Sequence, residues 1–207
     1  MREGRALKIS REVVFRRAIV VAMECEADAV RPHLAPSDKL YISGVGKVNA
    51  AAATQKAISE GAQEILNVGV AGGFADKAAI FGVYEIARAV EYDFDLSEIN
   101  GMGKGVHDER NTPYFALSVK GVFPSRTLGT GDRFGDGEGD LPLLKSLDVG
   151  VRDMEGAEIA HVCEKAAVPV RALKCITNIV GRGSTGSYAA NLEKALSCLS
   201  DALTSWM

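Results

Sequence analysis

Short runs of β-branched and aliphatic residues alternate with helical patterns along almost the whole chain, and this alternation most limits how the chain can fold. The first run, 18–23, is typical of a buried strand, and a helical segment over 26–33 follows it. Further strands are predicted at 40–42, 64–70, 82–91, 115–119, 126–128, 150–152 and 170–178, and further helices at 47–60, 156–165 and 187–204. Such alternation favours an α/β fold: one domain with a mixed, mostly parallel twisted sheet flanked by helices.

Length and composition agree with a single globular domain. The 207 residues are 47% hydrophobic and 25% charged, and a chain of this length can bury a substantial core. The first 17 residues hold six basic and two acidic side chains, spread without the apolar stretch of a secretory signal. We therefore expect a basic N-terminal extension over 1–17 and the α/β domain over 18–207.

Charge, hydropathy and cysteine spacing exclude several functional classes. The net charge of −3 gives no electrostatic reason to expect a nucleic-acid partner. The longest uncharged apolar run, 18–23, is far shorter than the ~20 residues of a membrane helix. Four widely separated cysteines and three histidines predict neither a zinc framework nor a disulfide scaffold. We expect a reduced, cytoplasmic protein that binds a small molecule without a metal or cofactor.

Acidic, amide and glycine residues gather where the predicted strands end, which is where a parallel sheet binds its ligands. Glu26 follows the first strand, Glu155 follows the strand at 150–152, and Asn178 closes the strand at 170–178. Carboxylates in such positions can activate water, or bind sugar hydroxyls and stabilise a cationic sugar. A surface or helix-capping role for Glu26 and Glu155 is the alternative.

Other motifs give weaker indications. The segment 43–47, Ser-Gly-Val-Gly-Lys, lacks the spacing of a nucleotide-triphosphate loop. The glycine-dense segment 129–140 is either a solvated loop or a lid that brings Phe134 over a flat ligand. His161, on a predicted helix among apolar residues, is interpreted as a packed structural histidine. No serine or cysteine nucleophile with a histidine partner is indicated.

Five segments occur in the order and spacing of a known family. They are Ala-Met-Glu-Cys-Glu at 22–26, Ser-Gly-Val-Gly-Lys-Val-Asn-Ala-Ala at 43–51, Asn-Val-Gly-Val-Ala-Gly-Gly at 67–73, Thr-Gly-Asp-Arg-Phe at 130–134 and the segment 153–162 around Met-Glu-Gly. From about residue 19 to the last helix, the chain resembles the 5′-methylthioadenosine/S-adenosylhomocysteine nucleosidases of the purine nucleoside phosphorylase superfamily. The resemblance implies a nucleoside phosphorylase-like fold, a homodimer and no cofactor.

The resemblance also implies an activity, hydrolysis of the ribosyl C1′–N9 bond of a purine nucleoside. Glu155 would bind the ribose hydroxyls and favour the oxocarbenium-like state, while Glu26 would hold and deprotonate the attacking water. The implied substrate-binding residues are Met23 and Met154 beside the sugar, Phe134 stacked on the purine, Gly135 at the purine edge through its backbone, Tyr188 near the ligand and Val70 in the glycine turn.

Three residues depart from the family pattern. Asn178 stands where the family has an aspartate that protonates the purine, Lys174 replaces the usual arginine, and Val70 replaces a serine or threonine. With asparagine at position 178, the chain resembles the members of the superfamily that act on 6-oxopurines, such as futalosine hydrolases and some phosphorylases. The alternatives are therefore a 6-oxopurine nucleoside hydrolase, a purine nucleoside phosphorylase and a non-catalytic nucleoside-binding relative. Hydrolysis is favoured over phosphorolysis because Asn67 stands where one phosphorylase branch carries arginine.

Overall fold

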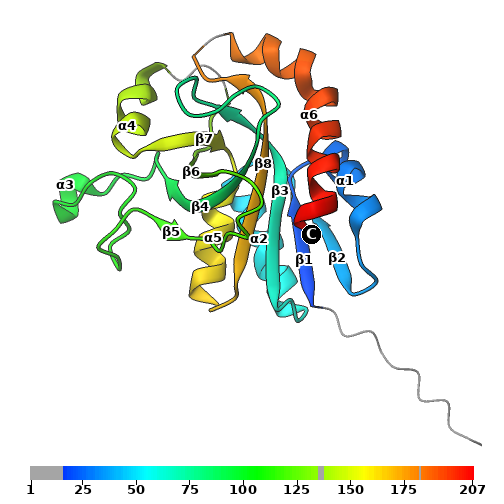
Figure 1. Cartoon of the computed structure of the whole chain (residues 1–207). Coiled ribbons are helices and arrows are strands. Elements are labelled where there is room, and N and C mark those ends of the chain that lie inside the picture. Colours follow the sequence, from blue (N-terminus) through cyan, green and yellow to red (C-terminus); the bar gives the residue numbers. More distant parts are fainter. Residues whose placement is uncertain (1–15, 135–137, 182) are drawn as a thin grey trace, which may run out of the picture.

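The computed structural model describes residues 16–134, 138–181 and 183–207, and it shows a curved sheet covered by helices on both faces (Figure 1). The elements are β1 (Arg17–Val21), α1 (Glu24–Val30), η1 (Arg31–His33), β2 (Asp38–Ile42), α2 (Lys47–Ser59), β3 (Glu64–Gly73), β4 (Val83–Glu91), α3 (Ser97–Asn100), β5 (Phe115–Ala116), β6 (Ser125–Thr130), η2 (Glu138–Asp140), α4 (Leu141–Ser146), β7 (Val149–Asp153), α5 (Gly156–Lys165), β8 (Val170–Ile179) and α6 (Ser184–Trp206). Most of the predicted N-terminal extension, 1–15, lies outside the described residues.

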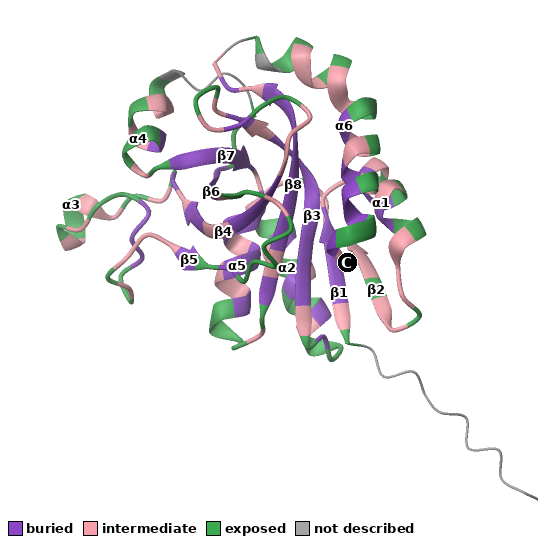
Figure 2. Ribbon diagram, viewed as in Figure 1, coloured by how far each residue is buried: buried purple, intermediate pink, exposed green. Residues whose placement is uncertain are grey.

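Two apolar layers hold the sheet between its helices. Side chains alternate between the faces of a strand, so Ala18 and Val20 of β1 join the layer under α2 and α5. Ile19 and Val21 join the opposite layer, which contains residues of α1 and α6. Figure 2 shows the central strands buried between these layers. Continuous apolar runs in the sequence therefore correspond to strands that are buried on both faces.

The sheet is mixed and mostly parallel, as the sequence predicts. β1 pairs in parallel with β2 and β3, β3 with β8, and β6 with β4 and β7. The pairings of β3 with β7, β4 with β5 and β4 with β8 are antiparallel. Through these contacts β3, β7, β6, β4 and β8 close a ring, which brings the ends of β3, β7 and β8 around one space.

Element boundaries differ from the sequence-based expectation in ways that the structure explains. The helix expected over 26–33 is α1 followed by the short 3₁₀ turn η1, because Pro32 cannot donate a hydrogen bond inside a helix. β1 starts at Arg17, whose guanidinium pairs with Asp38 of β2 at 2.7 Å. β3 runs to Gly73, three residues beyond its expected end, because its last residues pair with β7 and β8. Within the described residues, no helix combines the length and apolarity needed to span a membrane.

Candidate active site

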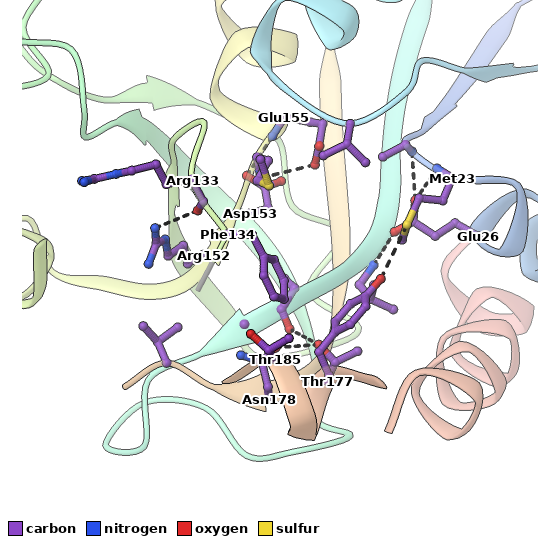
Figure 3. A pocket seen from close by; sticks show the side chains of 18 residues that line it. Met23, Glu26, Arg133, Phe134, Arg152, Asp153, Glu155, Thr177, Asn178 and Thr185 are labelled. Carbon is purple, nitrogen blue, oxygen red and sulfur yellow. Dashed lines mark hydrogen bonds between the residues drawn. The ribbon is translucent and has the colours of Figure 1, made fainter. Parts of the chain in front are cut away.

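A cavity of about 460 Å³ opens where β1, β3, β7 and β8 end, beside the start of α6 (Figure 3). Eight of the nine predicted site residues line it: Met23, Glu26, Val70, Phe134, Met154, Glu155, Asn178 and Tyr188. The ninth, Gly135, lies outside the described residues. The ends of β1 and β8, which lie 158 residues apart in the chain, thus meet in one space, as expected for a largely parallel sheet.

Glu26 is held rigidly in the first turn of α1. Its carboxylate accepts hydrogen bonds from the backbone N–H groups of Ala22 at 2.9 Å and Met23 at 3.0 Å. The third bond, at 2.8 Å, comes from the backbone N–H of Val70 in β3. Glu26 is only 3% exposed, and burial raises its pKa against the opposing effect of Lys174 and these three donors. Such a carboxyl is fixed in place and suited to accept a proton from water.

Glycine at position 69 is what allows Glu26 to approach β3. A Cβ atom at Gly69 would lie 2.5 Å from Glu26 Oε1, closer than non-bonded atoms tolerate. The glycine turn of β3 therefore provides both the space for this carboxylate and, at Val70, one of its donors.

Glu155 precedes α5 and is bound by the loop between β2 and α2. Its Oε1 atom accepts a hydrogen bond from the backbone N–H of Gly46 at 2.9 Å, and Gly46 has a φ of 103°, a conformation that favours glycine. Burial, followed by the nearby charge of Asp153, raises the pKa of Glu155 to about 7, although Lys174 opposes the shift. Glu155 therefore changes its charge near neutral pH.

Lys174 is the positive centre beneath these carboxylates. Its ammonium lies 2.9 Å from Asp153 Oδ2, and both side chains are 2% exposed. Burial opposes the charge on Lys174, but Asp153, Glu155 and Glu26 outweigh that cost and raise the pKa of the ammonium. Sequence comparison with the family marked Lys174 only as a departure, and the structure makes it the shared counter-ion of three acids.

Asp153 also shapes the start of α5. Its Oδ1 atom accepts from the hydroxyl of Thr130 at 2.6 Å, and its carboxylate accepts from the backbone N–H of Gly156. Asp153 thus links β6, β7, α5 and the buried ammonium of β8. The sequence places Asp153 at a strand end but does not reveal these partners.

Two aromatic rings form the more open wall of the cavity. Phe134 and Tyr188 pack edge to face with centroids 5.3 Å apart, and the Tyr188 hydroxyl lies 3.5 Å from Met23 Sδ. Phe134 is 54% exposed, which is unusual for a phenylalanine and leaves one ring face available to a flat ligand. Both rings thus lie in the cavity lining, and the stacking role of Phe134 stays a prediction.

Asn178 lies at the end of β8, 4% exposed, opposite Gly72 of β3. The hydroxyl of Thr177 donates to Asn178 Oδ1 at 2.8 Å, and the amide nitrogen points away from Thr177 (Figure 3). The backbone carbonyl of Thr177 in turn accepts from Asn191 of α6 at 2.8 Å. An amide anchored in this way presents a donor to a ligand.

Two arginines in the lining were not predicted from the sequence. Arg133 and Arg152 lie on the far side of Phe134 from Glu26 in Figure 3. Arg152 donates to the backbone carbonyl of Arg133 at 2.9 Å. Arg133 belongs to the family segment 130–134 but was given no role there, and Arg152 is a charged residue within the buried strand β7.

The glycine loop at 43–47 contributes backbone groups and no cation to the cavity. Besides the bond from Gly46 to Glu155, the backbone N–H of Lys47 donates to Asp132 at 2.9 Å. The ammonium of Lys47 binds Glu91 and Asp93 at 2.7 and 2.9 Å.

Three comparisons place these observations among known proteins. Residues 39–205 match a family model described as the phosphorylase superfamily. A 5′-methylthioadenosine/S-adenosylhomocysteine nucleosidase of Anoxybacillus flavithermus is 29% identical over 171 residues, which cover 75% of this chain and 74% of that protein. The Helicobacter pylori enzyme of the same name has a similar fold, with a TM-score of 0.83 at 22% identity over 94% of this chain and 98% of that one. A futalosine hydrolase of H. pylori gives a TM-score of 0.83 at 22% identity, over 93% of this chain and 97% of that one.

Proposed function

The chain belongs to the phosphorylase superfamily, and from that premise we propose that its cavity is the active site of a purine nucleosidase. The reaction is hydrolysis of the C1′–N9 bond of 5′-substituted nucleosides such as methylthioadenosine or adenosylhomocysteine. One observation carries this proposal: two buried carboxyls with raised pKa values, Glu26 and Glu155, line the same cavity as the exposed ring of Phe134. The names of the relatives above support the same activity.

Charge development in the reaction matches the charges of the site. Breaking the C1′–N9 bond puts positive charge on the ribose and negative charge on the purine. The carboxylate of Glu155 binds the ribose hydroxyls and stabilises the oxocarbenium-like sugar. Glu26 takes the proton of the attacking water, and its three backbone donors keep it oriented for that step. The products are a ribose that carries the water-derived hydroxyl and a purine anion, which takes up a proton from solvent while Glu26 releases the proton that it accepted.

The side chains around the carboxyls position the two halves of the substrate. Met23 and Met154 contact the sugar. Phe134 stacks on the purine, and Tyr188 of α6 covers the ligand from the side of that helix. Val70 contributes its backbone N–H to Glu26 and its apolar side chain to the cavity wall. The predicted role of Gly135 at the purine edge falls outside the described residues.

Water is favoured over phosphate as the attacking group. The cationic side chains in the described lining, Arg133 and Arg152, lie across Phe134 from Glu26. Asn67, beneath the glycine turn, donates to the backbone carbonyl of Val20 at 3.2 Å. A phosphate beside Glu26 would therefore meet a carboxylate and apolar groups instead of arginine.

A 6-oxopurine nucleoside, as in a futalosine hydrolase-like reaction, is the second candidate substrate. Asn178 supports it, because an amide can donate to N7 or a 6-oxo group but cannot supply the departing base with a full proton. Asn178 is then the catalytic residue that stabilises the purine in either reaction. The fold similarity to a futalosine hydrolase is compatible with this candidate.

The assembly and compartment form part of the proposal. We expect a homodimer, supported by the exposed side chains of Val45 and Val48 beside the cavity, 47% and 80% exposed. We also expect the protein to act in the cytoplasm. This expectation is supported by its four free cysteine thiols and by the absence of a disulfide among the described residues. Light scattering at several protein concentrations tests the dimer.

A panel of nucleosides tests the activity. The intact protein is incubated with methylthioadenosine, adenosylhomocysteine, inosine and futalosine, each with and without phosphate, and free base is measured. Release of base without phosphate supports hydrolysis, and strict dependence on phosphate identifies a phosphorylase. Binding of a nucleoside without release of base identifies a non-catalytic relative.

A further inference from the structure

A second cluster of titratable side chains lies outside the cavity, between α5 and the segment that follows β4. His107 and Glu109 belong to that segment, and His161 belongs to α5. One potential ligand atom from each of these three residues lies within 4.8 Å of the other two. None of the three lines the candidate active site.

The two histidine rings are fixed by aromatic neighbours. His107 stacks on Phe94 with centroids 4.0 Å apart, and His161 stacks on Phe115 at 4.7 Å. The histidine rings also meet each other edge to face at 4.7 Å. His161 therefore has the packed environment that the sequence predicts. Packing alone, however, provides no hydrogen-bond partner for its ring nitrogen Nε2.

The Nε2 atoms of both histidines are buried and, among the described residues, have no hydrogen-bond partner. His107 as a whole is 9% exposed. Glu91 Oε2 lies 2.9 Å from His107 Nε2 but outside hydrogen-bonding geometry. Glu109 Oε1 lies 3.8 Å from His161 Nε2. Buried polar atoms are almost always paired, so two orphaned nitrogens facing carboxylates need an explanation.

We propose that His107, Glu109 and His161 bind a divalent transition-metal ion of the zinc class. Two imidazoles and a carboxylate are a common donor set for zinc, with an open position for water. Ligand atoms bound at about 2.1 Å in a tetrahedron lie about 3.4 Å apart, so ligand atoms that lie within 4.8 Å of one another must move closer by up to about 1.4 Å when they bind the ion.

The cluster is accessible to an ion from solvent. Glu109 and His161 border a surface groove together with Thr112, Glu164 and Lys165. The ammonium of Lys165 lies 2.9 Å from Glu109 Oε1, with both side chains more than half exposed. An exposed ion pair of this kind contributes little stability, so a divalent ion can displace Lys165 from the carboxylate.

Titration of the metal-free protein with Co²⁺ and Zn²⁺ tests the proposal. Protein without an affinity tag is treated with a chelator and titrated with Co²⁺, whose visible d–d absorption reports nitrogen and oxygen ligation, and then with Zn²⁺ in competition. We expect one equivalent to bind. Zinc at about a hundredfold above its Kd is expected to raise the Tm by roughly 5–10 °C.

Substitutions separate this site from adventitious binding. His161→Gln is expected to weaken binding by more than about 100-fold, since loss of an outer-shell partner alone costs about 10–100-fold. The matched control is His33→Gln, because His33 is bonded to Ser200 at 2.9 Å outside the cluster and its loss leaves the Kd unchanged. Lys165→Met removes the competing cation and is expected to tighten binding several-fold.

Two results would overturn the proposal. One is the absence of a stoichiometric Co²⁺ spectrum from the intact protein, and the other is an unchanged Kd in folded His161→Gln. If His161→Gln does not fold, the surface variant Glu109→Gln decides, because an unchanged Kd there removes Glu109 from the ligand set. These measurements do not depend on the proposed nucleosidase activity, so the failure of either proposal is recognised separately.

Discussion

The ammonium of Lys174 lies 2.9 Å from the carboxylate of Asp153 in the interior of the protein, with both side chains 2% exposed. A buried pair of this kind contributes little net stability, because removing two charges from water costs about as much as their attraction returns. Its role is to bring a positive charge under Glu26 and Glu155, whose negative charges alone would repel each other. The two carboxyls proposed for catalysis therefore share the charge of one lysine that is absent from the cavity lining.

Loss of this lysine should be costly. Lys174→Met leaves Asp153 as an unpaired buried charge, and we expect the free energy of unfolding to fall by about 3–5 kcal/mol. Urea denaturation measures the change. The control is Lys104→Met, which removes an exposed partner of Asp95 and should cost about 0–1 kcal/mol. If the free energy of unfolding falls by the same small amount in both variants, the buried contact between Asp153 of β7 and Lys174 of β8 is not important for stability.

Neutralising either functional carboxyl should stop the reaction without unfolding the protein. We expect Glu26→Gln and Glu155→Gln each to lower kcat/KM by about 10²–10⁴-fold, because each removes a charge or a base that acts in the transition state. Glu24→Gln is the matched control, since Glu24 lies in the same turn of α1 and its side chain is 65% exposed. Activity near that of the control would remove the substituted residue from the mechanism.

The pKa of Glu155 predicts opposite effects of pH on activity and stability. If the anion of Glu155 is the active form, kcat/KM falls as pH decreases below about 7. The folded pKa lies above the ordinary value of about 4.5, so the folded state holds the proton more tightly than the unfolded chain. The stability from this group is complete below pH 4.5 and is lost as pH rises through 7.

Comparison with Glu155→Gln isolates the contribution of this carboxyl to stability. Glutamine resembles the protonated acid at every pH, so the variant should exceed the wild type in free energy of unfolding by up to about 3 kcal/mol above pH 7. The difference should shrink toward pH 4.5. Urea denaturation across this range measures it, and a difference that is constant with pH would contradict the raised pKa.

The sequence predicts the candidate site more completely than its supporting interactions. Glu26 and Asn178 could be placed together because each stands at the end of a strand whose apolar pattern is plain, and β1, β3 and β8 run in parallel and end at one edge. Glu155 joins them because the end of β7 meets the end of β3 in an antiparallel pairing. The pairing of Asp153 with Lys174 could not be predicted, because it depends on β7 meeting β3 antiparallel while β8 pairs with β3 in parallel.

The cluster of His107, Glu109 and His161 was missed for a related reason. His107 and Glu109 belong to an irregular segment between β4 and β5, where no hydrophobic period predicts a position in space. Only His161 lies on a predicted element, the helix α5. Because its neighbours in that helix are apolar, it was interpreted as a packed structural residue. Contact between an irregular segment and a helix is set by tertiary packing, which a single sequence does not reveal.

The glycine turn of β3 predicts a steric test of how Glu26 is positioned. A Cβ atom at residue 69 would lie 2.5 Å from Glu26 Oε1, so Gly69→Ala should push the carboxylate from its three backbone donors. A misplaced catalytic group can cost about 10²-fold, and we expect that loss in kcat/KM. Gly103→Ala is the control, because nothing lies within 4 Å of its added Cβ. Equal activity in the two variants would mean that Glu26 has room to move without consequence.

The amide of Asn178 predicts a change in base preference. Asn178→Asp introduces a carboxyl that can protonate N7 and then accept from an exocyclic amine, whereas the amide favours a 6-oxo base. We expect the ratio of kcat/KM for matched 6-amino and 6-oxo nucleosides to shift toward the 6-amino substrate by about 5- to 150-fold, since exchanging a donor for an acceptor in a closed pocket is worth roughly 1–3 kcal/mol. The hydroxyl of Thr177 can donate to either side chain, so the fold should tolerate the exchange.

A matched control separates base recognition from the effect of one added negative charge. Asn100→Asp keeps the oxygen that accepts from the backbone N–H of Met102 at 2.9 Å and lies away from the cavity lining. Its substrate ratio should equal that of the wild type. If Asn178→Asp also leaves the ratio unchanged, residue 178 does not contact the base. The purine would then have to bind elsewhere in the cavity, toward Arg133 and Arg152 on the other side of Phe134 from Glu26.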